Sequence, residues 1–489
     1  MVPETEVPTA LSAIAVSGVL LLVLKHLLGR HALDNFPGPP SLSFIKGTTI
    51  CELEFYRYLA DTFGGVVLLN GMWGEKQLYV SDPKALHHIL VKDQDEYEET
   101  DWFIHSNQLT FGAGLLSTIG EQHRRQRKML NPVFSMRHLA DMTPVFFEVV
   151  NKVRDTLKET VSGGPQEIDM LHWIKRTALE LIGQSGLGYS FYDLGANSRP
   201  SEYSGAVKGL TFEKSSKLNI FRRMTPYLVK LGPAGLRKFL VRLIPSADIQ
   251  KVCDIVDLMY ETSVRIIEFE KAVLEKGDEA LLQQVGRGRD IMSILSNMRA
   301  SEGDRLLKEE LTGQMSTLIF AAMDTTSPAL SRVLLLLAQH PDVQNNLRHE
   351  ISEAWPSDGE LDYNSLGSLP YLDAVIRETL RLARKDMVLP LSKPFAGNDG
   401  REMTEVLVPR GTTIEVAIIR ANREPEVWGS DAYEWKPERW LKPLPSSVAD
   451  AHYPGVYSNL MTFAGGGRAC IGFKFSELEI KVMLSVLLK

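Results

Sequence analysis

Cysteine is scarce in this chain: its 489 residues include only three, Cys51, Cys253 and Cys470, and these lie far apart. A disulfide framework or a structural zinc site needs paired or closely spaced cysteines, so the sequence favours neither. The sparse count is typical of a protein that folds in a reducing compartment.

Net charge is also small, at −7, which argues against nucleic acid as the main partner. The sequence has no internal repeat, no low-complexity tract and no evident inter-domain linker after Pro40. It lacks a Gly-x-Gly-x-x-Gly motif that opens a βαβ unit, so we expect no nicotinamide or flavin domain here. With 44% apolar and 24% charged residues, the composition is that of an ordinary globular protein.

The N-terminal region contains an uncharged apolar run, residues 7–24, that is about long enough to cross a bilayer. Acidic residues precede it and basic residues follow it, which argues against a cleaved signal peptide and places the body in the cytosol. We therefore predict a lumenal segment at 1–6, a transmembrane signal anchor at 7–24, a basic flank and proline-rich hinge at 25–40, and one large domain at 41–489. A short buried helix is the alternative interpretation of the apolar run.

Along the rest of the chain, the pattern predicts a small β part, a large helical body and a mixed C-terminal part. Helical periodicity dominates from about 134 to 340. Short strands are expected at 65–70, 77–80, 406–408 and 412–416. Breaks between helices are expected at 163–165, Pro226, 232–233 and Pro245, where glycine or proline interrupts the pattern.

The most informative segment is 463–472, in which Cys470 follows a glycine-rich loop and precedes an apolar run that predicts a helix. A cysteine at a helix N-terminus lies at the positive end of the helix dipole, where the thiolate is favoured. The glycines allow backbone N–H groups to approach a flat cofactor, and Arg468 offers a planar fork to a carboxylate. An iron porphyrin needs all of these features. A buried structural cysteine is the alternative interpretation.

This segment resembles the heme-binding signature of the cytochrome P-450 superfamily, Phe-x-x-Gly-x-Arg-x-Cys-x-Gly, at each specified position. The resemblance implies the P-450 fold, which is mainly α with small β-sheets, here behind an N-terminal transmembrane helix. It implies heme b (iron protoporphyrin IX) as the cofactor and Cys470 as the axial ligand of the heme iron. By the same resemblance, Phe463, Gly466, Arg468 and Gly472 bind the cofactor.

A second segment, 321–327, lies in a long apolar helix expected at about 311–340. It resembles the oxygen-activation motif of the superfamily, in which a carboxylate and a hydroxyl relay protons to dioxygen. The resemblance makes Asp324 the relay acid and Thr325 the hydroxyl that holds a water, with Ala321 and Ala322 close to the cofactor. The alternative is a buried helix whose polar side chains bond to its own backbone.

Two further groups are assigned by the resemblance. Glu378 and Arg381 would otherwise be a surface ion pair worth ~0.2–0.5 kcal/mol. In the superfamily such a pair joins a later arginine, here Arg439, in a buried network that supports the cysteine loop. His123 and Arg127 stand where family members hold a heme propionate, so a contact by both is expected.

A basic and apolar stretch, 207–244, carries nine Lys and Arg residues against one acid, Glu213. This combination predicts a segment on the membrane surface, with an ordinary exposed helix pair as the alternative. In the superfamily this region covers the substrate, so we expect a lipophilic substrate that enters from the membrane. The cations of the basic stretch 120–128 that do not bind a propionate, together with Lys474, predict a docking surface for an acidic electron donor, with a solvated helix face as the alternative.

Some positions depart from the superfamily pattern. Ala322 replaces the usual glycine, and Pro328 predicts a kink that frees the carbonyl of Asp324. A pocket loop that usually follows the Glu-x-x-Arg pair is short after Leu382. The sequence also ends at Lys489, before strands that superfamily members carry, which leaves the efficiency of catalysis open.

The resulting interpretation is a membrane-anchored monooxygenase of the endoplasmic reticulum, similar to fungal members of the superfamily. It would hydroxylate or epoxidise a small lipophilic substrate with dioxygen and electrons from an NADPH–cytochrome reductase, with a b-type cytochrome as an optional second donor. The alternatives are a heme-thiolate isomerase or dehydratase that acts on peroxides, and a heme-binding pseudoenzyme. Retention of Asp324 and Thr325 argues against the isomerase, which needs no proton relay.

Overall fold

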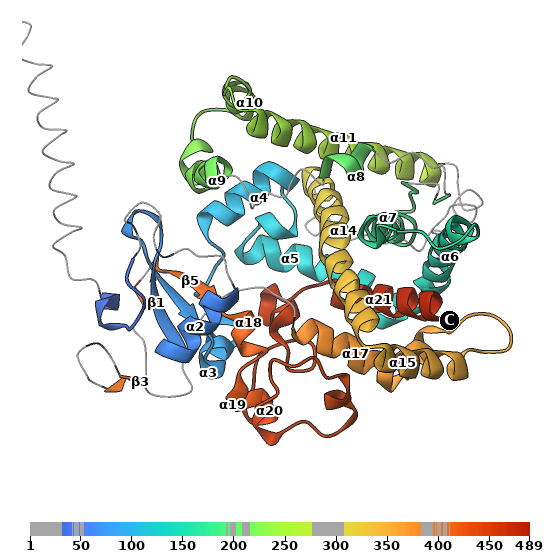
Figure 1. Ribbon diagram of the computed structural model, residues 1–489. Helices are drawn as coiled ribbons and strands as arrows, with labels where there is room; N and C mark the ends of the chain where they lie inside the picture. The colour runs from blue at the N-terminus through green and yellow to red at the C-terminus, as the bar shows by residue number, and fades with distance from the viewer. Residues whose placement is uncertain are drawn as a thin grey trace, which may run out of the picture. The chain divides into compact units, whose positions relative to one another are not determined.

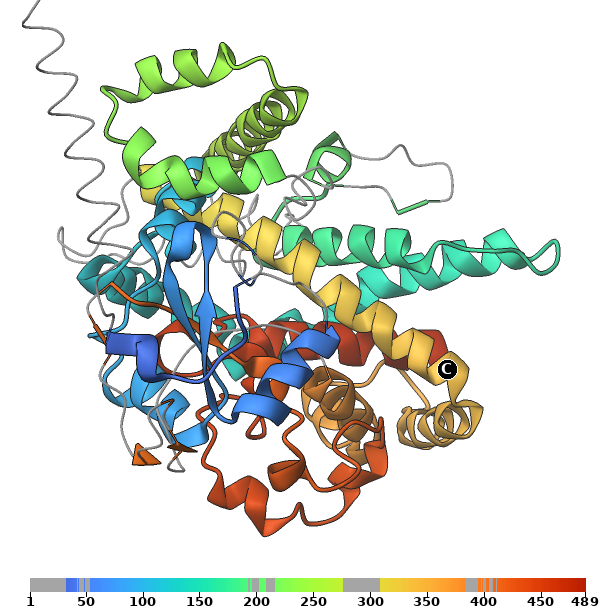
Figure 2. The same cartoon turned by 60° about the vertical axis from the view of Figure 1, so that its left-hand side comes forward.

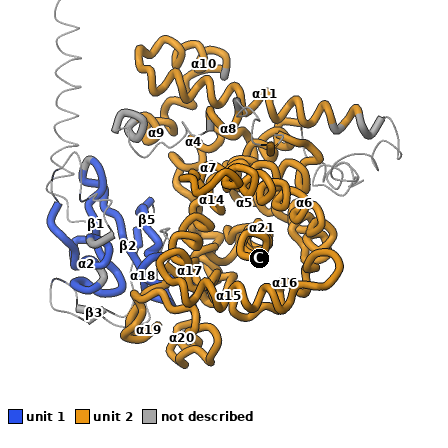
Figure 3. The backbone as a smooth tube through the Cα atoms, turned by 45° about the vertical axis from the view of Figure 1, so that its right-hand side comes forward, with its two compact units in different colours: residues 1–89, 385–421 blue, residues 90–384, 422–489 orange. Residues whose placement is uncertain are grey.

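The computed structural model describes residues 32–41, 43, 48, 53–191, 194–195, 202–207, 216–275, 308–382, 395–396, 398, 402–403, 408–409 and 411–489. The predicted anchor lies outside these residues, and none of the helices within them is long and apolar enough to cross a membrane. The chain separates into two compact units, residues 1–89 with 385–421 and residues 90–384 with 422–489 (Figure 3). The predicted division of the chain at residues 6, 24 and 40 stays a prediction.

The first unit is built on a small mixed sheet. Strand β1 (Val66–Asn70) pairs antiparallel with β2 (Lys76–Val80), and β2 pairs parallel with β5 (Thr413–Val416). Consecutive residues of β1 and β2 are buried, so side chains on both faces of these strands are covered. Its core contains Leu59, Val67, Leu69, Tyr79 and Ala417. The strands predicted at 65–70, 77–80 and 412–416 are thus confirmed.

Short elements complete the first unit. They are α2 (Leu53–Phe63), α3 (Pro83–His87), α18 (Ile418–Ala421) and the two-residue strands β3 (Phe395–Ala396) and β4 (Glu402–Met403). Asp82 caps α3, where its carboxylate accepts the N–H of Ala85 at 2.9 Å. Of the strand predicted at 406–408, only Val408 is described, and it is not in a strand.

The second unit is mainly helical. Its α-helices are α4 (Asp101–Phe111), α5 (Gly120–Leu130), α6 (Met136–Val161), α7 (Met170–Leu181), α8 (Glu202–Val207), α9 (Ser216–Leu228), α10 (Ala234–Arg242), α11 (Ala247–Glu275), α14 (Lys308–Gln339), α15 (Pro341–Ala354), α16 (Tyr363–Gly367), α17 (Pro370–Arg381), α19 (Pro425–Trp428), α20 (Ser446–Asp450) and α21 (Phe473–Leu488). The long helix α14 packs against α7, α17 and α21, as the yellow ribbon in Figures 1 and 2 shows. Mainly helical structure with a small mixed sheet agrees with the predicted fold class.

Most predicted helix breaks are confirmed. Helix α6 ends at Val161, before the Gly-Gly-Pro sequence, and α10 begins after Pro233. Pro226 is the exception, because it lies inside α9 and does not end it. A proline removes the N–H that would bond the carbonyl four residues back. Here that carbonyl, of Arg222, accepts the hydroxyl of Thr225 at 2.6 Å, which satisfies it and lets the helix continue.

Candidate active site

Cys470 lies at the end of a glycine-rich loop, two residues before Gly472, the N-cap of α21. It is exposed, and its backbone N–H donates to the carbonyl of Phe463 at 2.9 Å. Arg127 donates from Nη1 to the carbonyl of Ala469 at 2.6 Å, so its guanidinium lies beside the cysteine. A nearby cation and the start of a helix both favour the thiolate. Cys470 therefore has the surroundings of a soft metal ligand.

Close packing within the protein requires two glycines of this loop. A side chain at Gly465 would overlap the carbonyl oxygen of Pro454, and one at Gly466 would overlap that of Leu90. Gly466 also has a φ of +65°, in the left-handed region that favours glycine. The interpretation from sequence, in which these glycines serve the cofactor, missed this packing role.

Three nitrogen-bearing side chains gather near Cys470. Arg468 donates from Nη1 to the carbonyl of Thr118 and from Nη2 to Oε2 of Glu98, both at 3.0 Å. Burial, together with the positive charges of Arg468 and Arg127, lowers the pKa of His123 to about 4. His123 is therefore neutral at pH 7 and offers an N–H rather than a charge. Arg127 and Arg468 carry the positive charge of this cluster.

The basic stretch 120–128 forms α5, and one buried acid anchors it. Glu310 Oε1 on α14 accepts hydrogen bonds from Gln122 at 2.8 Å, Arg125 at 2.5 Å and Gln126 at 3.2 Å. Glu310 is 2% exposed, so the pairing compensates a buried charge. Arg125 is therefore structural, and fewer cations remain for docking than the sequence suggested.

On α14, the predicted relay residues are held by neighbours. Asp324 Oδ1 accepts a hydrogen bond from Nζ of Lys175 on α7 at 3.0 Å. Thr325 Oγ1 donates to the carbonyl of Ala321 at 2.7 Å, the back-bonding that the alternative interpretation expected. Thr325 is exposed, whereas Ala321 and Ala322 are half-buried. A carboxylate, a hydroxyl and two small side chains thus share one stretch of helix.

Helix α14 continues without interruption through Pro328, so the proline does not end it, and the predicted kink and freed carbonyl of Asp324 stay predictions. Buried residues on both sides of the proline pack against other helices and hold the helix together. Two residues before Pro328, Thr326 Oγ1 donates to Ser476 Oγ on α21 at 2.9 Å. This bond ties the helix of Asp324 to the helix that follows Cys470.

Glu378 and Arg381 form a fully buried ion pair at the end of α17. Nη2 and Nε of Arg381 lie 2.7 Å and 2.9 Å from the two carboxylate oxygens. Arg439 Nε lies 3.5 Å from Glu378, and its Nη1 donates to Asp431 at 2.7 Å. Trp440 Nε1 donates to Glu378 at 2.9 Å. The alternative of a surface pair is wrong, because both side chains are 0% exposed.

A chain of hydrogen bonds runs from this pair to the cysteine loop. Arg381 donates to the carbonyl of Asn422 at 3.0 Å. The buried side chain of Asn422 donates to Thr462 Oγ1 at 2.9 Å and accepts the N–H of Met461 at 2.7 Å. Thr462 directly precedes Phe463, whose carbonyl holds the N–H of Cys470. Asn422 carries no local sequence signal, and the sequence analysis missed it.

Helices α9 and α10, with Leu243 directly after α10, expose large apolar side chains beside cations. Tyr227, Phe239 and Leu243 are 66%, 60% and 63% exposed. Two of the cations are paired, since Lys238 and Arg242 each lie within 2.9 Å of Asp257 on α11. The positive charge predicted for this stretch is therefore partly neutralised. Residues 208–215 of the same stretch lie outside the described residues.

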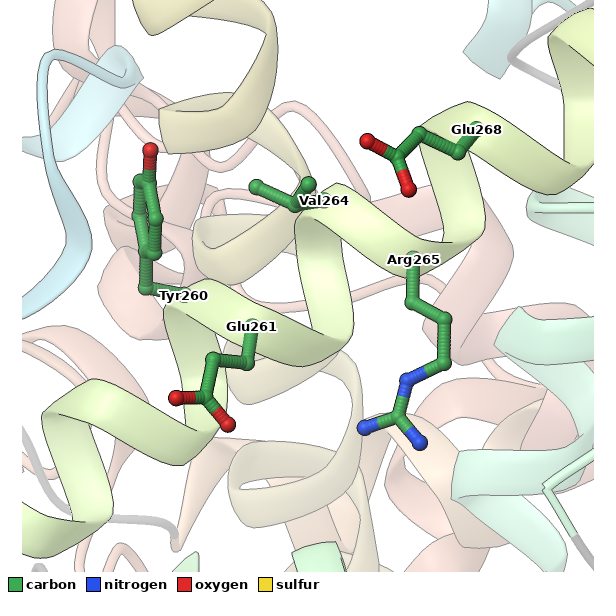
Figure 4. Close-up of a pocket in the computed structure, with 5 residues that line it drawn as sticks. All are labelled: Tyr260, Glu261, Val264, Arg265 and Glu268. Atoms are coloured by element: carbon green, nitrogen blue, oxygen red, sulfur yellow. The ribbon is translucent and has the colours of Figure 1, made fainter.

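A shallow hollow on α11 contains none of the predicted site residues. It is lined by Tyr260, Glu261, Val264, Arg265 and Glu268, all of which project from the one helix in Figure 4. Because a single helix face forms it, we assign it no part in the chemistry.

Comparison with known proteins identifies similar sequences. The cytochrome P450 family model matches residues 52–489. Cytochrome P450 monooxygenase 91 of Postia placenta is 49% identical over 96% of this chain and 90% of its own length. Monooxygenase 81 of the same fungus is 50% identical over 99% of this chain and 91% of its own length. A ganoderic acid synthetase of Ganoderma lucidum is 44% identical over 98% of this chain and 92% of its own length.

Proposed function

Because this chain belongs to the cytochrome P450 family and is a P450 monooxygenase, we propose that it hydroxylates or epoxidises a small lipophilic compound at Cys470-bound heme b. In such a reaction one oxygen atom of dioxygen enters the substrate and the other is reduced to water. When bound, the heme supplies the activation of dioxygen, which thiolate donation assists.

The observation that carries this proposal is the environment of Cys470. An exposed thiol with a guanidinium beside it, at the start of a helix, has the chemistry of an axial thiolate ligand. The carbonyl of Phe463 accepts the backbone N–H of Cys470, and Gly472 is the N-cap of the helix α21 that follows. The residues present therefore fit a heme-thiolate group.

Arg127, Arg468 and His123 would hold the two propionates. Two guanidiniums supply charge and planar donors, and neutral His123 supplies one N–H. Both arginines keep N–H donors beyond those used within the protein, because each guanidinium has five.

Asp324 and Thr325 would move protons and hold water. The carboxylate of Asp324, with Lys175 beside it, gives and takes protons, and the Thr325 hydroxyl orients a water between this acid and the reaction site. Ala321 and Ala322 leave room on this face of the helix. Glu378, Arg381 and Arg439 have a structural role, since their network supports the cysteine loop.

Electrons would come from an NADPH–cytochrome reductase, with a b-type cytochrome as a second donor, because this chain has no nicotinamide or flavin motif. We assign the protein to the endoplasmic reticulum membrane, with residues 7–24 as a single anchor and the body in the cytosol. The exposed apolar and basic side chains of α9 and α10 favour entry of a lipophilic substrate from the bilayer. We assign the reaction to secondary metabolism. Because one relative is named a ganoderic acid synthetase, compounds related to ganoderic acid are the first substrates to test.

The deciding experiment is the difference spectrum of the reduced, carbon-monoxide-bound full chain in membranes. We expect the thiolate-ligated band for the natural sequence and its loss for Cys470→Ser, with Cys253→Ser as the matched control. Absence of the thiolate band from the natural sequence would refute the proposal. Substrate-dependent NADPH consumption with reductase then separates a monooxygenase from a peroxide isomerase or a pseudoenzyme.

A further inference from the structure

An acidic segment, residues 93–101, has no part in the function described above. It carries six Asp and Glu residues among nine. Charge runs of this kind are usually solvated. In this segment, however, two side chains form hydrogen bonds with the cysteine loop. Gln94 Oε1 accepts the N–H of Gly467 at 2.7 Å. Glu98 reaches the neighbouring residue, Arg468.

Glu98 joins two elements of the cysteine site. Its Oε2 accepts Nη2 of Arg468 at 3.0 Å, and its Oε1 accepts the N–H of Gly120, the first residue of α5, at 3.1 Å. The carbonyl of Thr118 accepts Nη1 of the same arginine at 3.0 Å. The guanidinium is thus fixed by two acceptors on different segments, which leaves the orientation of its plane little freedom.

Such fixing has a physical consequence for any anion that Arg468 binds. A long arginine side chain loses rotamer freedom on binding, and a guanidinium that is already oriented loses less. Arg468 and Arg127 also repel each other: burial lowers the pKa of Arg127, and the positive charge of Arg468 acts in the same direction. The carboxylate of Glu98 balances part of this charge before an anion arrives. Glu98 and the carbonyl of Thr118 use two of the five N–H donors of Arg468, and the others stay available.

We propose that Glu98 is a positioning residue, which orients Arg468 for a heme propionate and so slows loss of the cofactor. This inference rests on the proposed heme-thiolate function. Glu98 acts through Arg468 and has no contact with the cofactor in this role. The opposite role, in which Glu98 competes with the propionate for Arg468, makes the opposite prediction: removal of Glu98 would then tighten heme binding.

The test measures transfer of heme from the full chain in detergent to excess apomyoglobin. Glu98→Ala is expected to speed heme loss about fivefold, because the Glu98–Arg468 ion pair is partly exposed and such pairs contribute up to about 1 kcal/mol. Glu98→Gln keeps an acceptor for Arg468 and is expected to restore most of the natural rate. The matched control is Glu96→Ala, in the same acidic segment, whose exposed side chain makes no hydrogen bond or ion pair among the described residues.

A second measurement separates positioning from general damage. In an Arg468→Ala background, Glu98→Ala is expected to add nothing to the rate of heme loss, because the residue through which it acts is gone. Equal rates for Glu98→Ala and Glu96→Ala, or slower heme loss in Glu98→Ala, would overturn the proposal while leaving the function intact. A natural chain without the thiolate band would overturn both.

Discussion

At the scale of residues, the candidate site combines two paired arginines with one neutral histidine. Arg127 lies beside the cysteine, Arg468 is held by Glu98, and His123 stays neutral at pH 7 because burial lowers its pKa. Two cations and one neutral donor would match the two carboxylates of the proposed heme b without a large excess of charge. The positive charge near Cys470 thus depends on the partners of Arg127 and Arg468 as well as on the two arginines themselves.

The buried pair Glu378–Arg381 leads to a first prediction. Glu378→Ala leaves a guanidinium that is 0% exposed without its carboxylate. Breaking a buried pair in this way costs about 3–5 kcal/mol, so we expect a much lower denaturation midpoint and little heme in the purified protein. Urea denaturation and the ratio of heme to protein absorbance measure both effects.

The control for this prediction is an exposed pair of the same chemistry. Glu148 and Lys152 lie on α6 with side chains 61% and 53% exposed. Glu148→Ala should change stability by about 0.5 kcal/mol or less, because exposed pairs contribute little. Equal effects of the two substitutions would argue against a supporting role for the buried pair.

Asp324 leads to a second prediction. Asp324→Asn keeps the shape and a hydrogen-bond acceptor for Lys175 but removes the acid. If this carboxylate moves protons, product formation should fall roughly 100-fold with an unchanged carbon-monoxide band. Lys175→Met keeps the acid and removes its partner, so a smaller loss is expected. Full turnover of Asp324→Asn would exclude a relay role.

At the scale of elements, α21 carries an unusual buried acid one helix turn beyond Ser476. Glu479 is 0% exposed, and neither of its carboxylate oxygens has a hydrogen-bond partner among the described residues. Burial raises the pKa of this group to about 8. The folded protein therefore holds this side chain as a neutral acid at pH 7, in the helix that follows the cysteine loop.

This pKa predicts a pH dependence of stability. Between the ordinary value of 4.5 and about 8, the folded state binds more protons at Glu479 than the unfolded state. Stability from this group is therefore lost as pH rises, by roughly 1.4 kcal/mol per pH unit in that window. Glu479→Gln cannot ionise, so its stability relative to the natural chain should increase from pH 5 to pH 8.

Urea denaturation at several pH values measures this difference. Glu159→Gln, at an exposed position of α6, is the control and should show a flat difference across the same range. A flat difference for Glu479→Gln as well would mean that the buried acid finds a partner that keeps it ionised. Glu479 would then not make the stability of the protein depend on pH.

Sequence predicted the elements of the site better than their connections. The motif around Cys470, the helix of Asp324 and the Glu378–Arg381 pair were all identifiable, because each is encoded within ten residues. Their partners were not, since Lys175 and Asp324 are 149 residues apart and Glu98 and Arg468 are 370 apart. Pairing over such separations depends on tertiary packing, which helical periodicity does not encode.

At the scale of the whole molecule, membrane contact links the proposed anchor to the proposed substrate. A lipophilic compound is concentrated in the bilayer, so an enzyme that meets it there benefits from a second membrane contact besides its anchor. The exposed apolar side chains of α9 and α10 are suited to such a contact, since cations lie among them. Pairing of Lys238 and Arg242 with Asp257 shifts the balance toward apolar burial.

This reasoning gives a final prediction, tested with a protease site inserted at 25–31, between the proposed anchor and the buried residue Leu33. After cleavage, the natural body should remain on anionic vesicles that sediment, whereas a Phe239→Asp, Leu243→Asp variant should be released. Burying each apolar side chain contributes ~1.5–3 kcal/mol, so the double change should weaken binding by at least about tenfold. Met136→Asp, at a position of α6 that is 58% exposed, is the control and should leave binding unchanged. Equal sedimentation of both variants would show that α9 and α10 do not contact the bilayer, and the substrate would then need another route of entry.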